Sequence, residues 1–234
     1  MEQRGIPSRI LTWTGEKPRH GIEQAAREAR YRLLSGACRR EGCRALLLGH
    51  HRQDQAETFL IRQAKNSGPA GLAGMSAVRA ADFGRILRPV LGIYPAALRE
   101  YNRACSINWV EDETNLSDDF DRGRLRRVLT PGQIDDAFAQ TLVYGKKRRG
   151  LEERTAAFIR ENVVKSDMGY LLFGQDAFRE LDRETALFCL GDFLRFIADR
   201  PYAPRSDSLK ILLDNICSCL LYTSDAADDR ISVD

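Results

Sequence analysis

Several patterns that define common protein classes do not occur in this sequence of 234 residues. The six cysteines form no C-x-x-C pair, which argues against a zinc ribbon and against a secreted disulfide framework. The three histidines are His20, His50 and His51, and their spacing suits neither a zinc site nor a Ser-His-Asp hydrolase. No run reaches the ~18 apolar residues of a membrane span, and the first residues lack the pattern of a signal peptide. We therefore expect a cytoplasmic protein with free thiols, no metal site of its own and no membrane contact.

The length and the charge leave room for more than one domain and for a nucleic-acid partner. The chain is 43% hydrophobic and carries a formal net charge of +3. Such a mild excess of cations permits binding to nucleic acid without demonstrating it. Four consecutive cations, Lys146 to Arg149, could contact phosphates, but a solvated helix face explains them equally well.

The spacing of apolar residues predicts an α/β fold in the first part of the chain. Short strands are expected at 9–13 and 85–91, and the apolar run at 44–49 is typical of a strand buried on both faces. Helical periodicity covers 21–39 and 54–65. Alternating strands and helices predict a mostly parallel sheet.

After about Pro131 the pattern becomes mostly helical. Amphipathic helices are expected at roughly 133–163 and 182–199, with a hairpin between them. We therefore predict an α/β domain over 1–131 and a smaller, mostly helical domain over 132–219. Residues 220–234 show no periodicity and resemble translated adapter sequence, so we expect this tail to be non-native.

A polar segment, GHHRQD, joins the strand at 44–49 to the helix that follows it. In open α/β sheets, ligands bind beyond the carboxyl ends of the strands, so this segment has the position of an active site. Asp54 and Glu57 are three residues apart and lie on nearly the same helix face, where they could bind an amine or a metal ion. The same D-x-x-E pattern also fits a capping box with Asp54 as the N-cap. The residues leave both interpretations open.

Four segments together resemble a known enzyme family. They are GIEQAAREARYRLL, GHHRQDQAETFLIRQAKNSGPAGLAGM, ILRPVL and WVEDETNLSDDFDRGRLRRVLTP, in that order over residues 5–131. Their order and spacing resemble those of tRNA(Ile)-lysidine synthetase, which has the N-type ATP-pyrophosphatase, or PP-loop, fold. The resemblance implies that ATP adenylates the first anticodon cytidine of the CAU-anticodon tRNA(Ile), and that free L-lysine then displaces AMP. It implies ATP and Mg²⁺ as cofactors, a nucleotide-binding role for 1–131, a tRNA-binding role for 132–219, and a possible homodimer.

The family's motif residues can be transferred onto this sequence one by one. His51, Asp54 and Glu57 take the implied catalytic positions, with His51 as a donor to the α-phosphate and the two carboxylates receiving the lysine ammonium. Gln53 stands where the family has a further aspartate. The resemblance implies lysine or tRNA binding by Gln55, Arg88, Asp112, Asn115, Arg122, Arg124 and Arg126. Gly123 replaces an asparagine of the family pattern, and Lys65-Asn66 replaces an arginine-glycine pair.

The family's glycine-rich S-G-G-x-D-S loop, which cradles the ATP pyrophosphate, does not occur in these residues. We therefore expect this chain to be a fragment that cannot convert ATP to AMP by itself, with an exposed sheet edge. Two alternatives stay open. One is a non-catalytic remnant that binds tRNA through its clustered cations. The other is a PP-loop tRNA thiolase, for which Cys38 and Cys43 would be the nearest cysteine pair.

Overall fold

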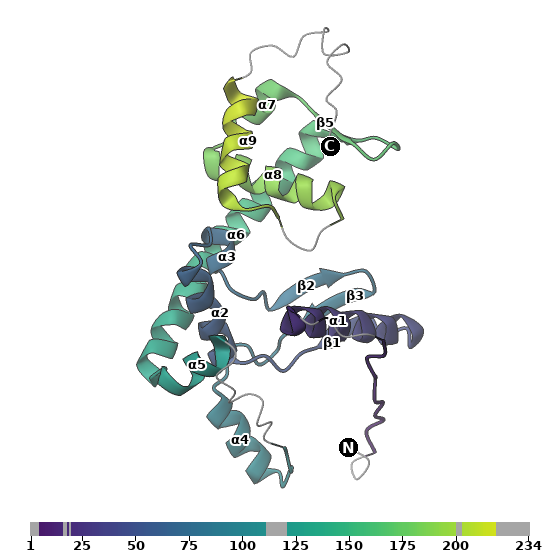
Figure 1. Cartoon of the computed structure of the whole chain (residues 1–234), viewed down its shortest axis with the longest axis vertical. Coiled ribbons are helices and arrows are strands. Elements are labelled where there is room, and N and C mark those ends of the chain that lie inside the picture. The colour runs from purple at the N-terminus through teal and green to yellow at the C-terminus, as the bar shows by residue number, and fades with distance from the viewer. Residues whose placement is uncertain (1–4, 16–17, 19, 111–120, 200–202, 219–234) are drawn as a thin grey trace. The chain divides into compact units, whose positions relative to one another are not determined.

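The computed structural model describes residues 5–15, 18, 20–110, 121–199 and 203–218 (Figure 1). The chain divides into two compact units. The first unit comprises Met1–Ile61 and Gly74–Ala139, and the second comprises Arg62–Ala73 and Gln140–Asp234. The predicted boundary after residue 131 stays a prediction. The predicted non-native tail at 220–234 lies outside the described residues.

The first unit contains a three-stranded sheet in the order β1-β3-β2. β1 (Ala45–Leu47) pairs in parallel with β3 (Gly84–Leu87), and β2 (Val78–Ala81) pairs with β3 in the antiparallel sense. The α/β fold class is thus confirmed, and the sheet is mixed. The strand expected at 9–13 is wrong, because residues 6–14 adopt no regular structure and pair with no described strand.

β1 is less buried than its sequence predicts. Among the described residues it pairs with β3 alone, so it forms an edge of the sheet. Leu46 is half-buried, while Leu47 is 63% exposed. A continuous apolar run predicts burial on both faces only when further elements cover those faces. The exposed sheet edge that we expected is therefore present in the described part of the chain.

The first unit contains five helices or parts of helices in the described ranges. They are α1 (Ile22–Arg40), α2 (Arg52–Ala64), α4 (Pro95–Ala104), α5 (Asp121–Val128) and the start of α6 (Pro131–Asn162). Of these, α1, α2 and α6 follow the predicted periodicity. α1 runs beside the sheet (Figure 1), and the guanidinium of Arg79 from β2 lies 5.4 Å from the ring centre of Tyr31 in α1. Arg39 near the end of α1 also pairs with Asp82 in the β2–β3 turn.

The second unit is a helical cluster with one hairpin, as predicted. It contains α3 (Pro69–Leu72), most of α6, β4 (Val163–Lys165), β5 (Leu171–Phe173), α7 (Gln175–Arg179), α8 (Arg183–Ile197) and α9 (Ser206–Ser218). Its core joins α6, α7, α8 and α9 through buried apolar side chains. Phe158 and Phe178 meet edge to face at 5.8 Å, a favoured geometry for aromatic pairs. The expected helices at 133–163 and 182–199 are confirmed within a few residues.

No helix in the described ranges is long and apolar enough to cross a membrane.

The β2–β3 turn depends on a glycine. Gly84 has φ +145°, and a Cβ added there would lie 2.2 Å from the carbonyl oxygen of Arg44. That oxygen accepts the Arg85 N–H at 2.9 Å, which aligns β3 with the start of β1. The backbone atoms of Arg44 leave no room for a side chain at this position.

We predict that Gly84→Ala lowers the free energy of unfolding of the first unit by about 2 kcal/mol or more, because the clash is with backbone and the φ is unfavourable. Gly132→Ala is the control, since an added Cβ there meets nothing within 4 Å. Hydrogen exchange of β1 and β3 amides in rising urea would measure both variants. Equal stability of the two variants would contradict the prediction.

Candidate active site

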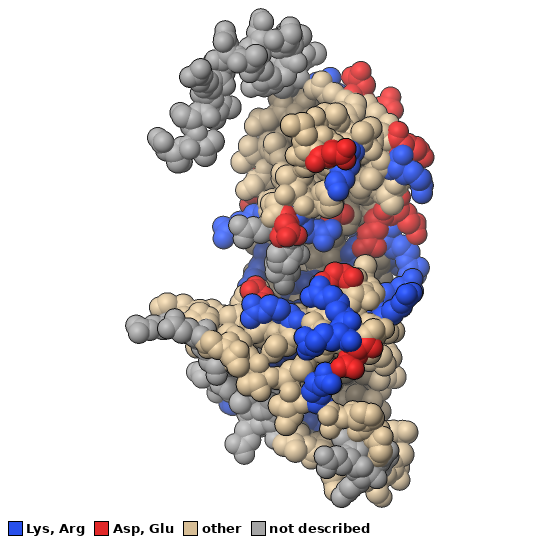
Figure 2. Space-filling view, turned by 90° about the vertical axis from the view of Figure 1, so that its right-hand side faces the viewer, with Lys and Arg blue, Asp and Glu red and all other residues tan. Residues whose placement is uncertain are grey.

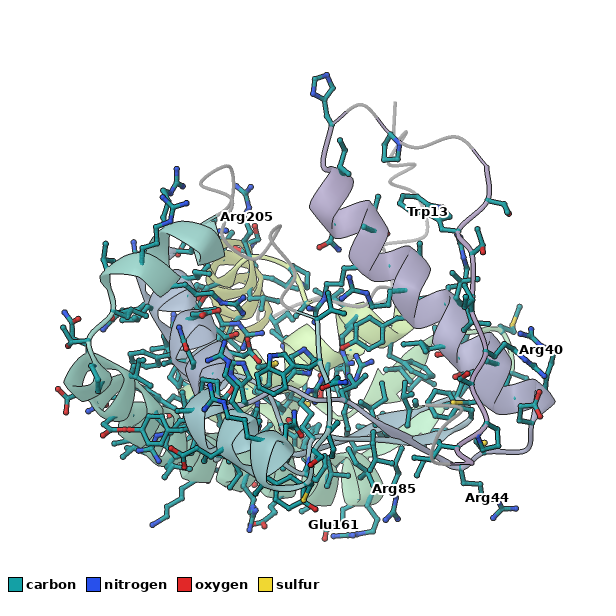
Figure 3. All side chains as sticks on the ribbon, turned by 90° about the horizontal axis from the view of Figure 1, so that it is seen from below. Trp13, Arg40, Arg44, Arg85, Glu161 and Arg205 are labelled. Atoms are coloured by element: carbon teal, nitrogen blue, oxygen red, sulfur yellow. The ribbon has the colours of Figure 1, made fainter. Side chains whose placement is uncertain are left out.

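Two of the implied site residues, His51 and Arg88, follow the carboxyl ends of the parallel strands, at the same end of the sheet. His51 lies four residues after the end of β1, and Arg88 follows β3 directly. The ladder continues one step past the strands, because Leu48 N–H donates to the carbonyl of Leu87 at 2.9 Å. Ligands of α/β sheets bind beyond this end. At the opposite ends of the same strands, Arg44 and Arg85 point outward (Figure 3).

His51 is the N-cap of α2. The helix begins at Arg52, and the His51 carbonyl accepts the Gln55 N–H at 3.2 Å. The Asp54 carboxylate accepts the His51 backbone N–H at 2.9 Å, and His51 Nδ1 accepts the Asp54 N–H at 3.4 Å. These two bonds form a reciprocal capping box. The capping interpretation that made Asp54 the N-cap is wrong by one turn: Asp54 occupies the third helical position, and Glu57 is not part of the box.

The first half of α2 is buried on all sides. Six consecutive residues, from Asp54 to Phe59, are buried, although an ordinary surface helix buries only one stripe. Four of them are polar, so each needs a hydrogen-bond partner. Thr58, for example, donates its hydroxyl to the Asp54 carbonyl at 2.7 Å. A helix start of this kind is packed as part of the core.

Arg126 of α5 joins the two carboxylates. Its Nη2 lies 2.9 Å from Asp54 Oδ1, and its Nε lies 2.8 Å from Glu57 Oε1. The Glu57 side chain is 0% exposed, that of Asp54 is 10% exposed and that of Arg126 is 23% exposed. Asp54 and Glu57 therefore lie on one face, as their spacing predicts, and this face carries a cation from the same chain. We call these three residues the ion triad.

The two carboxylates favour the charged form of the Arg126 guanidinium. Desolvation opposes the charge of Arg126, but hydrogen bonds and Coulomb attraction from Glu57 and Asp54 exceed it, so the pKa of Arg126 is raised. Arg126 is therefore a permanent cation in the triad. Its charge offsets the cost of burying Glu57 at this depth.

Gln55 makes a two-point contact with a turn 20 residues further along the chain. Its Nε2 donates to the Met75 carbonyl at 2.9 Å, and its Oε1 accepts the Met75 N–H at 2.8 Å. Gly74 precedes this contact with φ +66°, and a Cβ there would lie 2.7 Å from Gln55 Oε1. The described contacts of Gln55 thus fix the position of the turn. A substrate contact by this side chain stays a prediction.

The other implied binding residues differ in what the structure says of them. Arg88 is buried, and its Nη1 donates to the Ser76 carbonyl at 2.7 Å. Its Nε is also buried and has no hydrogen-bond partner among the described residues. Arg124 is exposed on α5. Asp112, Asn115 and the side chain of Arg122 lie outside the described part of the chain.

Sequence reasoning missed a cluster around Arg52, the first residue of α2. Its guanidinium lies 4.7 Å from the ring centre of Tyr94 and 4.3 Å from that of Phe138. Its Nη2 lies 2.7 Å from Asp135 Oδ1, and the same carboxylate accepts the Tyr94 hydroxyl. No local pattern reveals this cluster, because its members lie in three separate segments between residues 52 and 138. The spacing of Asp135 and Phe138 on one helix face is the only trace in the sequence.

Burial lowers the pKa of His51. Desolvation is the largest cause, the guanidiniums of Arg126 and Arg99 add to it, and the Asp54 carboxylate opposes it. His51 is therefore neutral at pH 7. Because Nδ1 accepts the Asp54 N–H, the ring proton resides on Nε2, and the ring presents an N–H donor away from the helix cap.

Other candidate sites in the described ranges carry less chemistry. The described ranges contain no group of three or more His, Cys, Asp or Glu side chains that could hold a metal ion. Cys38 is buried, which raises its pKa and makes it a poor nucleophile for a thiolase. Trp13 lies beside α1 (Figure 3). A cavity of about 370 Å³ at this place is lined by Arg9, Leu11, Trp13, Ala26, Ala29, Arg30, Leu33 and Leu34. Cationic side chains on the face in Figure 2 are mixed with acidic ones.

Comparison with known proteins decides the family of the chain. Residues 1–133 match the PP-loop domain. The chain belongs to the PP-loop family. Within this family, 33% of residues are identical to the tRNA(Ile)-lysidine synthase of Mesorhizobium japonicum over 240 residues, which is 97% of this chain and 53% of that protein. The tRNA(Ile)-lysidine synthase of Methylobacterium nodulans is 47% identical over 125 residues, which is 53% of this chain and 37% of that protein.

A third relative, the tRNA(Ile)-lysidine synthase of Bradyrhizobium diazoefficiens, is 37% identical over 183 residues, which is 78% of this chain and 47% of that protein. The resemblance seen in the four sequence segments is thus confirmed. This PP-loop chain spans about half the length, or less, of the curated relatives it matches.

The ion triad gives a prediction about stability. Arg126→Met removes the cation that lies 2.8 Å from the buried Glu57 carboxylate, so we expect the free energy of unfolding of the first unit to fall by about 3–5 kcal/mol. Adding Glu57→Gln to that variant removes the uncompensated charge and should recover a large part of the loss. Hydrogen exchange of α2 amides in rising urea reports on the unit directly.

The control for Arg126 is Arg127→Met, which changes an exposed arginine of the same helix. A surface arginine contributes about 1 kcal/mol or less, so this variant should be nearly neutral. Equal losses in the two variants would show that the triad does not stabilise the unit.

The lowered pKa of His51 gives a prediction about pH. The folded protein binds a proton on His51 less tightly than the unfolded chain does, because the folded pKa is lowered. The neutral His51 ring therefore makes its full contribution to the free energy of unfolding above about pH 6.5, and this contribution is lost as the pH falls through the folded pKa. His51→Asn keeps a capping side chain but cannot titrate. The free energy of unfolding should therefore fall less between about pH 7.5 and about pH 5.5 in His51→Asn than in the wild type. Parallel pH profiles would contradict this.

Proposed function

We propose that this chain is the catalytic-domain part of a tRNA(Ile)-lysidine synthase, a ligase that forms a carbon–nitrogen bond. In this reaction ATP adenylates C2 of the first anticodon cytidine of tRNA(Ile) with a CAU anticodon, and the ε-amine of free L-lysine then displaces AMP. The observation that carries the proposal is similarity to a tRNA(Ile)-lysidine synthase along 97% of the chain. The convergence of His51, Asp54 and Glu57 beyond the ends of parallel strands supports it. The proposed location is the cytoplasm.

His51 has the properties of a neutral hydrogen-bond donor in this proposal. Its Nε2–H can donate to an oxygen that gains negative charge, and it does so without a proton transfer. The ring is held by the capping box, so its direction is set before any substrate arrives. Preorganised donors of this kind stabilise developing charge because they need not reorient during the reaction.

Asp54 and Glu57 are the proposed carboxylates for lysine. Their oxygens already interact with Arg126 at 2.9 and 2.8 Å. A lysine ammonium would therefore have to displace the guanidinium of Arg126 or share the carboxylate oxygens with it. The guanidinium of Arg126 thus carries the same positive charge as the lysine ammonium that the site would receive. The proposal predicts competition between free lysine and Arg126 for the same oxygens.

The described residues do not form a phosphate site for ATP at the start of α2. A helix N-terminus attracts phosphate through its unpaired N–H groups. Here Arg52 N–H donates to the Ile93 carbonyl at 2.9 Å, and Asp54 N–H donates to His51. The Asp54 carboxylate adds negative charge at the same place. We therefore assign the ATP phosphates no contact with these backbone N–H groups, which leaves the His51 Nε2–H as the proposed donor to the α-phosphate. Mg²⁺ enters the proposal only together with ATP phosphates.

A chimera tests the proposed function. Residues 5–131 would replace the matching segment of an active tRNA(Ile)-lysidine synthase, and incorporation of radiolabelled lysine into a CAU-anticodon tRNA(Ile) transcript would be measured. We expect incorporation that depends on ATP, with His51→Ala as the inactive control. A chimera that folds and binds tRNA without transferring lysine, beside an active parent, would favour the non-catalytic tRNA-binding alternative.

In the same chimera we predict that Asp54→Asn impairs lysine transfer more than adenylation. The change removes one negative charge from the oxygens proposed to bind the ammonium, while its amide oxygen can still accept the His51 N–H. Lysine saturation curves and pyrophosphate release would separate the two steps. Unchanged saturation by lysine would leave Asp54 with a capping role alone.

A further inference from the structure

Residue 52 is held at both its backbone and its side chain by parts of the chain far away in sequence. Its N–H donates to the Ile93 carbonyl at 2.9 Å, and its guanidinium lies over the ring of the next residue, Tyr94. Two consecutive residues therefore contact the two ends of one arginine. This pairing attaches the loop before α4 to the first residue of α2.

The same guanidinium also attaches the beginning of α6. Asp135 and Phe138 are three residues apart on that helix, and both contact Arg52, one through an ion pair at 2.7 Å and the other through its ring at 4.3 Å. Tyr94 closes the arrangement, because its hydroxyl donates to the same Asp135 carboxylate. Four side chains from three separate segments are thus joined at one cation. We call Arg52, Tyr94, Asp135 and Phe138 the arginine cluster.

A planar guanidinium is needed for this set of contacts. It can lie against an aromatic ring and donate to a carboxylate in its own plane, whereas an ammonium is a point charge that is more strongly hydrated. The Arg52 side chain is 23% exposed, and contacts of this kind strengthen when water is removed. The Arg52 Nε is buried and has no hydrogen-bond partner among the described residues. The cluster keeps this geometry although one donor is left unsatisfied, a cost that other contacts must offset.

The peptide unit between His51 and Arg52 transmits this constraint to the histidine. Its carbonyl, from His51, accepts the Gln55 N–H, and its N–H, from Arg52, donates to Ile93. The peptide plane is therefore fixed from both sides. On its other side, the His51 N–H is held by Asp54. The backbone of His51 has no freedom to rotate unless one of these bonds breaks.

We propose that Arg52 is a positioning residue for His51: through the arginine cluster it fixes the peptide plane that sets the direction of the His51 ring. Arg52 itself does not touch substrate in this inference. The inference rests on the proposed function only for the task that the His51 Nε2–H performs. The position and the tautomer of the ring are properties of the protein alone, so they can be tested without ATP, tRNA or lysine.

Nuclear magnetic resonance of the full 234-residue chain with ¹⁵N-labelled histidine provides the test. Only three histidines contribute signals, and His51→Asn assigns the signal of His51. In the wild type we expect the neutral ring with its proton on Nε2. In Arg52→Met we expect a mixture of the two neutral tautomers and a titration midpoint moved upward toward about 6.5, the value of an exposed histidine. Charged groups that face His51 are Asp54, Arg126 and Arg99, and none of them is altered.

Two further variants separate positioning from general stability. Arg27→Met removes another arginine that lies over an aromatic ring, 5.3 Å from the centre of Tyr31, and should leave the His51 signals unchanged. Arg52→Lys keeps the charge but loses the planar contacts, so it should give signals between those of the wild type and Arg52→Met. A change in His51 that Arg27→Met reproduces would overturn the inference.

A folded Arg52→Met protein with wild-type His51 signals would also overturn it. If Arg52→Met does not fold, Phe138→Leu decides, because this milder change removes one ring contact and leaves the charges in place. Altered His51 signals in folded Phe138→Leu support the inference, and unaltered signals refute it. Failure of the lysine-transfer chimera with intact His51 positioning would instead refute the proposed function.

Discussion

The buried carboxylate of Glu57 is the constraint on which the site depends. An ionised side chain that is 0% exposed requires a cation, and the chain supplies Arg126 from a helix 69 residues further on. Because Arg126 also binds Asp54, the same contact connects the capping box of α2 to α5. A charge that is costly to bury thus connects α5 to the start of α2.

Three independent contacts immobilise this helix start. The capping box fixes its first turn, the Gln55 amide holds the turn at Met75, and the arginine cluster attaches the segments that begin α4 and α6. The second and third contacts join α2 to different parts of the first unit. Polar side chains in a core normally reduce stability unless all of them are satisfied, and here they are used to define a unique geometry. Such rigidity is what a preorganised donor such as the His51 Nε2–H requires.

Sequence reasoning succeeds where the information is local. The periodicity at 21–39 predicts α1, and the position of GHHRQD after a strand predicts where the polar residues gather. The spacing of Asp54 and Glu57 predicts a shared face, which Arg126 then occupies. The identity of the cap was missed because histidine is not a common N-cap, and its ring nitrogen accepts in place of the usual oxygen.

Non-local information accounts for the other differences. A strand was expected at 9–13 from composition, but a strand needs a hydrogen-bonded neighbour, and none is described beside these residues. The burial of β1 was overestimated for the same reason, because covering elements cannot be read from the apolar run itself. The arginine cluster joins residues 52, 94, 135 and 138, and no window of sequence contains them together.

The amide of Gln55 has a consequence for which length changes this segment can tolerate. It joins two points 20 residues apart, with α2 and the turn at Gly74 between them. One residue inserted into α2 after Gln55 would rotate all later helical residues by about 100° and advance them by about 1.5 Å. The Met75 backbone would then reach the Gln55 side-chain amide only if the loop between α2 and Gly74 changed its conformation to compensate for that rotation. Insertions and deletions are therefore expected to be rare between Gln55 and Met75 and to be tolerated more easily in the exposed turn at Asp82.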